Sequence, residues 1–250
     1  YIIQMPPKKQ SKYKPINCYK LKDVIKLSPK MNNPGYKNHK INLHFNALIL
    51  GSTGSGKTNI LLNLIALMSK TFNHLYIFSQ KEEPLYTHLT NKLHPDVFTI
   101  TYGYENFLKF DEDSYYGNSL IIFDDFVAIK DQSRINDHFI RGRKLSSSNT
   151  SKGGNYGCSS IYLSQGYFKT PHLIRLQCNL IFVVRVRSLV DLGRMLKEYS
   201  GEESKENLKN MYAYCCVNSD FGEFLLIDLN TTRDKIYRRN YDEYLNVLEF

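Results

Sequence analysis

The fold is decided by one stretch of eight residues, Gly51-Ser52-Thr53-Gly54-Ser55-Gly56-Lys57-Thr58. This stretch fits the phosphate-binding pattern G-x-x-x-x-G-K-[ST], called the P-loop or Walker A motif, at every position. Glycines allow backbone N–H groups to surround phosphates, and the start of the following helix adds the positive end of its dipole. We therefore expect the loop to bind ATP, with Lys57 on the β- and γ-phosphates and the Thr58 hydroxyl on Mg²⁺.

The sequence on both sides of the loop has the context that a P-loop requires. The apolar run Phe45–Leu50 ends directly at Gly51, as a buried strand would, and residues 59–65 continue as an apolar helical stretch. A Gly/Ser loop that matched by chance would lack this strand–loop–helix order. The context favours a true nucleotide site.

Farther along the chain, short apolar runs alternate with helical stretches, which is typical of an α/β fold with a largely parallel sheet. We predict a P-loop NTPase core with a mostly parallel central sheet and a C-terminal β-hairpin. The predicted strands are Phe45–Leu50, Leu75–Ser79, Val97–Thr101, Leu120–Phe123, Ser159–Leu163 and Leu180–Val186. The predicted helices are Lys57–Ser69, Leu85–Leu93, Gln132–Lys144, Pro171–Gln177, Leu189–Tyr199 and Glu203–Met211. The hairpin is expected from Tyr212–Val217 and Glu223–Asp228, which flank Asn218-Ser219-Asp220.

The positive charge of the chain is concentrated at its N-terminal end. Residues 1–40 hold ten lysines and one acid, so they carry 10 − 1 = +9, whereas the remainder has 23 basic and 23 acidic residues. We expect a basic N-terminal extension (1–40), a P-loop ATPase domain (41–230) and a C-terminal tail (231–250). The extension either contacts DNA phosphates or an acidic partner, or is a solvated lead-in. No apolar run reaches the roughly 20 residues of an integral membrane segment.

A second motif supplies carboxylates. Residues 119–125 read Ser-Leu-Ile-Ile-Phe-Asp-Asp, an apolar strand ending in two acids, as in a Walker B motif. We expect Asp124 to bind Mg²⁺ and Asp125 to orient or deprotonate the attacking water. A second acid beside the metal ligand, together with the lack of an Asn-Lys-x-Asp guanine-reading motif, favours an enzyme that hydrolyses ATP to drive motion.

Residues 161–165, Ile-Tyr-Leu-Ser-Gln, form an apolar run with a polar C-terminal tip. Because ligands of doubly wound sheets lie beyond the carboxyl ends of the strands, Gln165 is a candidate sensor of the γ-phosphate. The alternative is a glutamine that only caps the next turn.

The order of these motifs resembles that of the HerA/FtsK superfamily of pumping ATPases. The resemblance rests on Gly142-Arg143-Lys144, Leu163-Ser164-Gln165, Leu176-Gln177-Cys178-Asn179 and Ile181-Phe182. Residues 161–168, with Pro171 and Ile174-Arg175, are closer to one branch, the genome-packaging ATPases of poxviruses, other large DNA viruses and virophages. The match runs from about Asn42 to about Val186.

The resemblance implies a RecA-like core. It also implies a homo-oligomeric ring, pentameric or hexameric, that hydrolyses ATP between subunits and pumps double-stranded viral DNA into a preformed capsid. It also implies a capsid or portal-vertex partner, and a location in the host cytoplasm (viral factory) or in the virion. By motif position, Arg143 is the arginine that would act on the neighbouring subunit's ATP, with Arg175 as the second candidate. Either arginine can instead form a surface ion pair or contact DNA.

Two other functions stay open from the sequence. One is a cellular-type DNA pump or helicase-like ATPase, and the other is a nucleotide-switched assembly scaffold without turnover. The chain also departs from the family pattern, because the Ser/Gly-rich stretch Ser146–Gly154 separates Arg143 from the sensor strand. This stretch either projects toward the channel or a neighbour, or is a tolerated surface insertion.

Overall fold

The computed structural model describes residues 16–23, 32–111, 115, 118–144, 157–200 and 204–250. The chain divides into two compact units, residues 1–30 and residues 31–250. The described part of the first unit contains a short 3₁₀ helix, η1 (Cys18–Lys20). The stretch Ser146–Gly154 lies outside the described residues.

The second unit is built on a mixed sheet. Its described residues form nine strands in the order β3-β2-β4-β5-β1-β6-β7-β8-β9. The six parallel strands are β1 (Asn46–Leu50), β2 (His74–Ser79), β3 (Phe98–Tyr102), β4 (Ser119–Asp124), β5 (Cys158–Ser164) and β6 (Leu180–Val183). The antiparallel strands β7 (Leu225–Asp228), β8 (Tyr237–Arg239) and β9 (Glu243–Tyr244) extend the sheet beyond β6. The predicted α/β class, the mostly parallel sheet and the C-terminal antiparallel strands are therefore confirmed.

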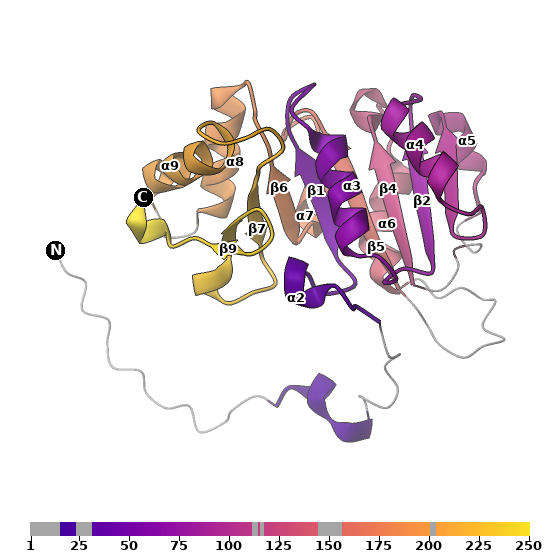
Figure 1. The fold of residues 1–250 in the computed structure, drawn as a ribbon, viewed down its shortest axis with the longest axis horizontal. Helices are drawn as coiled ribbons and strands as arrows, with labels where there is room; N and C mark the ends of the chain where they lie inside the picture. The colour runs from indigo at the N-terminus through magenta and orange to yellow at the C-terminus, as the bar shows by residue number, and fades with distance from the viewer. Residues whose placement is uncertain (1–15, 24–31, 112–114, 116–117, 145–156, 201–203) are drawn as a thin grey trace. The chain divides into compact units, whose positions relative to one another are not determined.

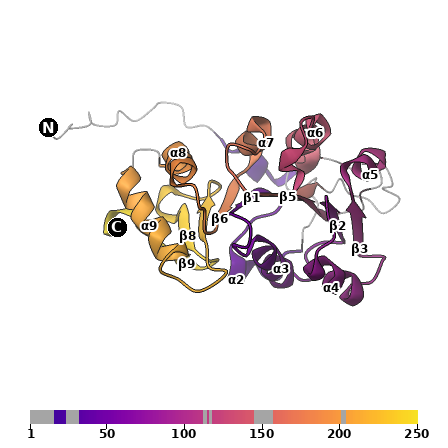
Figure 2. The ribbon, with the colours of Figure 1, turned by 90° about the horizontal axis from the view of Figure 1, so that it is seen from above.

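Helices cover both faces of the sheet (Figure 1). Figure 2 shows α3 (Lys57–Leu67) and α4 (Pro84–Lys92) on one face, and α5 (Tyr104–Lys109), α6 (Ser133–Arg141), α7 (His172–Gln177) and α8 (Leu189–Tyr199) on the other. Strand β1 shows why both layers form: Ala47 and Ile49 belong to the core under α3, whereas Leu48 and Leu50 belong to the opposite core. Side chains alternate along a strand, so a strand buried on both faces must be apolar at nearly every position.

One predicted strand is wrong. Residues 212–217 were expected to form half of the hairpin, but α9 (Lys205–Cys216) contains most of them. Leu208, Met211, Tyr212 and Cys215 are buried at the spacing of one helix face, and the Ser204 hydroxyl caps the helix start by accepting from Glu206 N–H. The antiparallel partners of β7 are instead β6 and β8.

Other element boundaries differ from the expected ones in detail. The helix predicted over 132–144 is α6 followed by the 3₁₀ turn η4 (Gly142–Lys144). The strand predicted over 180–186 ends at Val183, and α5, β8, β9 and the short α2 (Tyr36–His39) were not predicted. The remaining 3₁₀ turns are η3 (Phe126–Ala128), η5 (Arg233–Lys235) and η6 (Val247–Glu249).

A buried ion pair ties the C-terminal strands to the segment before β1. Arg238 of β8 is fully buried and pairs with Asp228 at the end of β7. The same guanidinium donates to the carbonyl of His39 at 3.1 Å. Because a buried charge without its partner is strongly destabilising, these contacts hold the outer strands and α2 together.

Candidate active site

The P-loop connects β1 to α3 and needs glycine at several positions. Gly54 and Gly56 have φ values of 75° and 94°, a region that side chains rarely adopt. A methyl group at Gly51 would lie 2.4 Å from the Ser55 hydroxyl oxygen. Backbone N–H groups of Gly51 and Ser52 donate to the carbonyls of Ser164 and Arg185, at 3.1 Å each. Strands β5 and β6 lie on either side of β1. The two hydrogen bonds therefore fix the loop to the end of β5 and to the segment that follows β6.

Lys57 and Thr58 begin α3 and point into this loop and the cavity beside it. Lys57 Nζ donates to the carbonyls of Gly51 at 3.0 Å and Ser52 at 3.3 Å. Burial lowers the pKa of the Lys57 ammonium, while Asp124, Asp125 and Glu83 act in the opposite direction. The Thr58 hydroxyl donates to Oε2 of Glu83 at 3.1 Å.

Asp124 is the last residue of β4 and Asp125 follows it, and both line the same cavity. Tyr86 of α4 donates its phenolic hydrogen to Oδ2 of Asp124 at 2.7 Å. Burial raises the pKa of Asp124 to about 6, against the effect of that hydrogen bond. Asp125 has a φ of 61°, a left-handed conformation that Asp tolerates better than most residues. This turn separates the two carboxylates, so that they have different partners.

Gln165 connects the two motifs. It lies directly after β5, and its Nε2 donates to Oδ1 of Asp125 at 3.1 Å. Its Oε1 accepts from the Thr53 hydroxyl of the P-loop, also at 3.1 Å. Parallel strands end at the same edge of the sheet, which is why residues 53, 125 and 165 meet there.

These side chains line a cavity of about 500 Å³ at the carboxyl ends of the strands. Two lysines and four carboxylates line it, together with uncharged residues: Lys57, Lys81, Glu82, Glu83, Asp124, Asp125, Thr53, Gly54, Gly56, Thr58, Asn59, Ser79, Leu85, Leu163, Gln165 and Phe221. The structure therefore brings together the predicted P-loop, both predicted acids and the predicted sensor.

The donor set of the cavity fits Mg²⁺. Mg²⁺ in nucleotide sites binds one or two protein oxygens and completes its shell with waters and substrate phosphates. Asp124 keeps its Oδ1 outside the Tyr86 hydrogen bond, and the Thr58 oxygen retains lone pairs while its hydrogen points to Glu83. A cavity with more carboxylates than lysines also needs a cation before it can hold a polyphosphate. Thr58 and Asp124 are the residues that would bind the ion.

Three residues of the site were missed from the sequence: Glu83 and Phe221, which line the cavity, and Tyr86, which is buried behind Asp124. Glu83 directly precedes α4, and the signal for it was an acid just after a predicted strand. Tyr86 lies inside a correctly predicted helix, but only the packing of α4 shows that it faces Asp124. Phe221 lies in the loop between α9 and β7, where the sequence predicted only a turn.

Arg143 lies at the amino-terminal end of β5, whereas the cavity lies at the carboxyl ends of the parallel strands. It is part of η4, and its carbonyl oxygen would be 2.1 Å from a methyl group at Gly157, the residue before β5. Gln165, the predicted sensor, follows the opposite end of the same strand. Arg143 is exposed, and it cannot reach the P-loop of its own chain.

Arg175 is held inside its own chain. Its guanidinium lies over the rings of Tyr167 and Phe168, at 4.5 and 5.0 Å from their centroids. It also pairs with Glu198 at 3.4 Å, and only 11% of its side chain is exposed. These contacts hold Arg175 of α7 between the segment that follows β5 and helix α8.

Among the described residues, no helix combines the length and apolar character needed to cross a membrane.

Comparison with known proteins gives the family. A profile of the poxvirus A32 protein family matches residues 35–230. No significant match was found among curated protein sequences. The genome packaging NTPase B204 from Sulfolobus turreted icosahedral virus 2, in complex with ATP-γS, is similar in fold, with a TM-score of 0.56 and 16% identity. That similarity covers 82% of this chain and 100% of B204.

Two further B204 structures agree. The AMPPCP complex of the same protein has a TM-score of 0.53 at 16% identity, covering 80% of this chain and 98% of that one. The DNA-packaging ATPase B204 from Sulfolobus turreted icosahedral virus has the same scores and coverage. At these low identities, the TM-scores show that the fold is shared. The family match spans the P-loop, both acids and the sensor strand, and it confirms the resemblance seen in the sequence. The chain belongs to the poxvirus A32 protein family.

Proposed function

We propose that this protein is an ATP-hydrolysing DNA translocase that pumps double-stranded viral DNA into a preformed capsid. The observation that carries the proposal is the meeting of P-loop, paired acids and Gln165 in one cavity. A nucleotide-switched scaffold needs the P-loop to bind nucleotide. Because it does not hydrolyse ATP, it does not need a catalytic carboxylate such as Asp125 with Gln165 bonded to it. The printed functions of the B204 proteins, genome packaging NTPase and DNA-packaging ATPase, support the same proposal.

In this proposal each group has one task. Lys57 stabilises the charge that develops on the β- and γ-phosphates. Asp125 accepts the proton of the attacking water. Gln165 donates a hydrogen bond to the Asp125 carboxylate and in this way helps to orient the water. Mg²⁺ held by Thr58 and Asp124 would neutralise phosphate charge. Loss of the γ-phosphate would change the contacts of Gln165, which also bonds the P-loop through Thr53.

The test of the motor function is ATP turnover with and without double-stranded DNA. We expect double-stranded DNA to raise turnover, because a translocase couples hydrolysis to movement along its track. Single-stranded DNA of equal length is the matched control, since a helicase-like ATPase would respond to it. Turnover that no nucleic acid changes would contradict the translocase.

The position of Arg143 leads to a separate prediction. Because it lies at the edge of the sheet opposite the P-loop, any action on ATP must occur in a neighbouring subunit of a homo-oligomeric ring. We therefore propose that Arg143 stabilises transition-state charge in trans. Mixing Arg143→Ala with wild-type protein should give an activity that is not proportional to the wild-type fraction. Removing such an arginine costs about 10³-fold or more in turnover.

Arg141→Ala is the matched control for this experiment. Arg141 lies two residues away, is exposed and forms an i,i+4 ion pair with Asp137 at 3.7 Å. Its replacement should leave mixed assemblies with full activity. A strictly linear response for Arg143→Ala would contradict action between subunits.

We further propose that the basic residues 1–40 are an extension of the ATPase domain. We also propose that a capsid or portal-vertex protein is the docking partner and that the protein works in the host cytoplasm or the virion.

A further inference from the structure

Phe221 is an exposed aromatic residue beside the P-loop. It lies in the loop between α9 and β7, and 75% of its surface is accessible. Its ring edge packs directly on the last glycine of the P-loop: a methyl group at Gly56 would be 3.2 Å from Cζ of Phe221. Among the described residues, no other aromatic ring and no cation lies against this ring. Phe221 lines the cavity together with Thr53, Gly54 and Gly56 of the P-loop, and most of its surface is accessible to a ligand.

The sheet order places Phe221 and the acids on opposite sides of the P-loop. Asp124 ends β4 and Gln165 follows β5. Both strands lie on the same side of β1. Strand β7, which Phe221 precedes, lies beyond β6 on the other side. In a nucleoside triphosphate, the γ-phosphate and the base are the two ends of the molecule. If the γ-phosphate faces the acids, the base lies toward Phe221.

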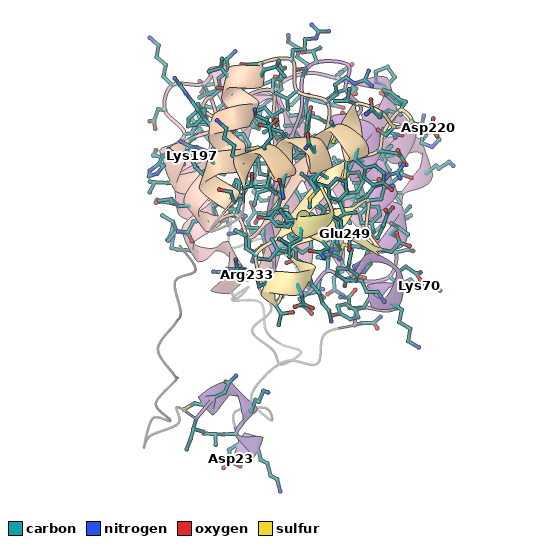
Figure 3. All side chains as sticks on the ribbon, turned by 90° about the vertical axis from the view of Figure 1, so that its left-hand side faces the viewer. Asp23, Lys70, Lys197, Asp220, Arg233 and Glu249 are labelled. Atoms are coloured by element: carbon teal, nitrogen blue, oxygen red, sulfur yellow. The ribbon has the colours of Figure 1, made fainter. Side chains whose placement is uncertain are left out.

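The loop that carries Phe221 is firmly anchored. The Glu223 carboxylate accepts from Arg239 of β8 at 2.8 and 3.0 Å and from the backbone N–H of Asp220 at 3.1 Å. Gly222 has a φ of 91°, and a methyl group there would lie 2.9 Å from Nδ2 of Asn59 in the first turn of α3. Figure 3 shows Asp220 at one side of the face that carries α9. These contacts hold the ring in place beside α3 before any ligand arrives.

We propose that Phe221 is the base-stacking platform of this site and that its ligand is the purine base of a nucleoside triphosphate. This inference rests on the proposed nucleotide function and adds the subsite for the base. The flat face of a purine covers more of a phenyl ring than a pyrimidine does, and offset stacking of the two rings is favourable beyond the area buried. The P-loop then binds the phosphates while Phe221 binds the other end of the ligand.

The chain contains no tryptophan, which permits a direct test. In Phe221→Trp the single indole reports on its own surroundings. We expect MgATP to quench its emission, and magnesium tripolyphosphate, which has the phosphates but no base, to leave the emission unchanged. Leu248→Trp is the matched control, because Leu248 is 80% exposed in η6 and does not line the cavity. Its emission should respond to neither ligand.

Affinities measured by calorimetry complete the test. Phe221→Ala should raise the Kd for ATP by about 5- to 100-fold, the usual range for losing one base–aromatic stack. The Kd for tripolyphosphate should change by less than about twofold, and Phe221→Tyr should restore the ATP affinity to within about twofold.

Two results would overturn the inference while leaving the nucleotide site intact. One is an unchanged Kd for ATP in Phe221→Ala. The other is an equal loss for ATP and tripolyphosphate, which would make Phe221 a support of the P-loop. If the wild-type chain binds neither ligand, the proposed nucleotide function fails as well, so the two failures are distinguishable.

Discussion

Lys57→Ala should lower kcat/KM for ATP by about 10³-fold, the scale of losing one charge-stabilising group in a water-poor site. Lys57 Nζ is already placed at the P-loop, where it donates to the carbonyls of Gly51 and Ser52. The shortened side chain leaves the phosphate charge without its cation, and neither the loop backbone nor the α3 dipole replaces a full charge. Phosphate release under steady-state conditions measures the effect, and calorimetry with MgATP separates binding from turnover.

Lys92→Ala controls for the loss of a positive charge. Lys92 is an exposed residue in the last turn of α4, and it does not line the cavity. Its replacement should leave turnover unchanged, and thermal unfolding should show that both variants are folded. Normal ATP turnover in Lys57→Ala would contradict the assignment of this cavity as the ATP-hydrolysing site.

Asp125→Asn should bind MgATP yet hydrolyse it about 10² to 10⁴ times more slowly, because a neutral amide cannot accept the proton of water. The substitution preserves the shape of the site. An asparagine can direct its carbonyl oxygen to the Nε2 of Gln165, which now donates to Oδ1 of Asp125 at 3.1 Å. Single-turnover hydrolysis, with binding measured in parallel, should therefore show a loss in the chemical step alone.

Glu83→Gln is the informative partner experiment, because Glu83 is a second carboxylate in the same cavity. It accepts from the Thr58 hydroxyl and so orients the oxygen that would bind Mg²⁺. We expect a higher magnesium requirement and a higher KM, with a smaller change in kcat. If Glu83→Gln abolished the chemical step while Asp125→Asn did not, the role of the base would pass from Asp125 to Glu83.

The sequence alone predicted those parts of the site that depend on local chemistry. The P-loop is a contiguous run whose glycines are needed for its own backbone path, as the positive φ values of Gly54 and Gly56 show. The strand that ends at Asp124 is apolar from Leu120 to Phe123 because both of its faces are buried, so it could be predicted without knowing its neighbours. In the strand before Gln165 only the central run Ile161–Leu163 is apolar, and that run was enough to predict a strand.

Where a short apolar run can serve either as strand or as helix, local pattern was not enough. Residues 212–217 combine two tyrosines, an alanine, two cysteines and a valine, and they suggested a strand. Burial of Leu208, Met211 and Cys215 along one helix face decided for α9. The stabilisation comes from packing against the core, which is a property of the whole fold.

The sequence by itself thus determined that the chain binds phosphates on a parallel α/β sheet and which acids follow the strands. Only the tertiary structure decided what surrounds them: Glu83 on Thr58, Tyr86 on Asp124, Phe221 on Gly56, and Arg143 at the far edge of the sheet. The physical reason is that the P-loop is built by neighbours in the chain, through backbone sterics. The other contacts join strands whose order in the sheet is set by long-range burial, and that order cannot be read from any one segment.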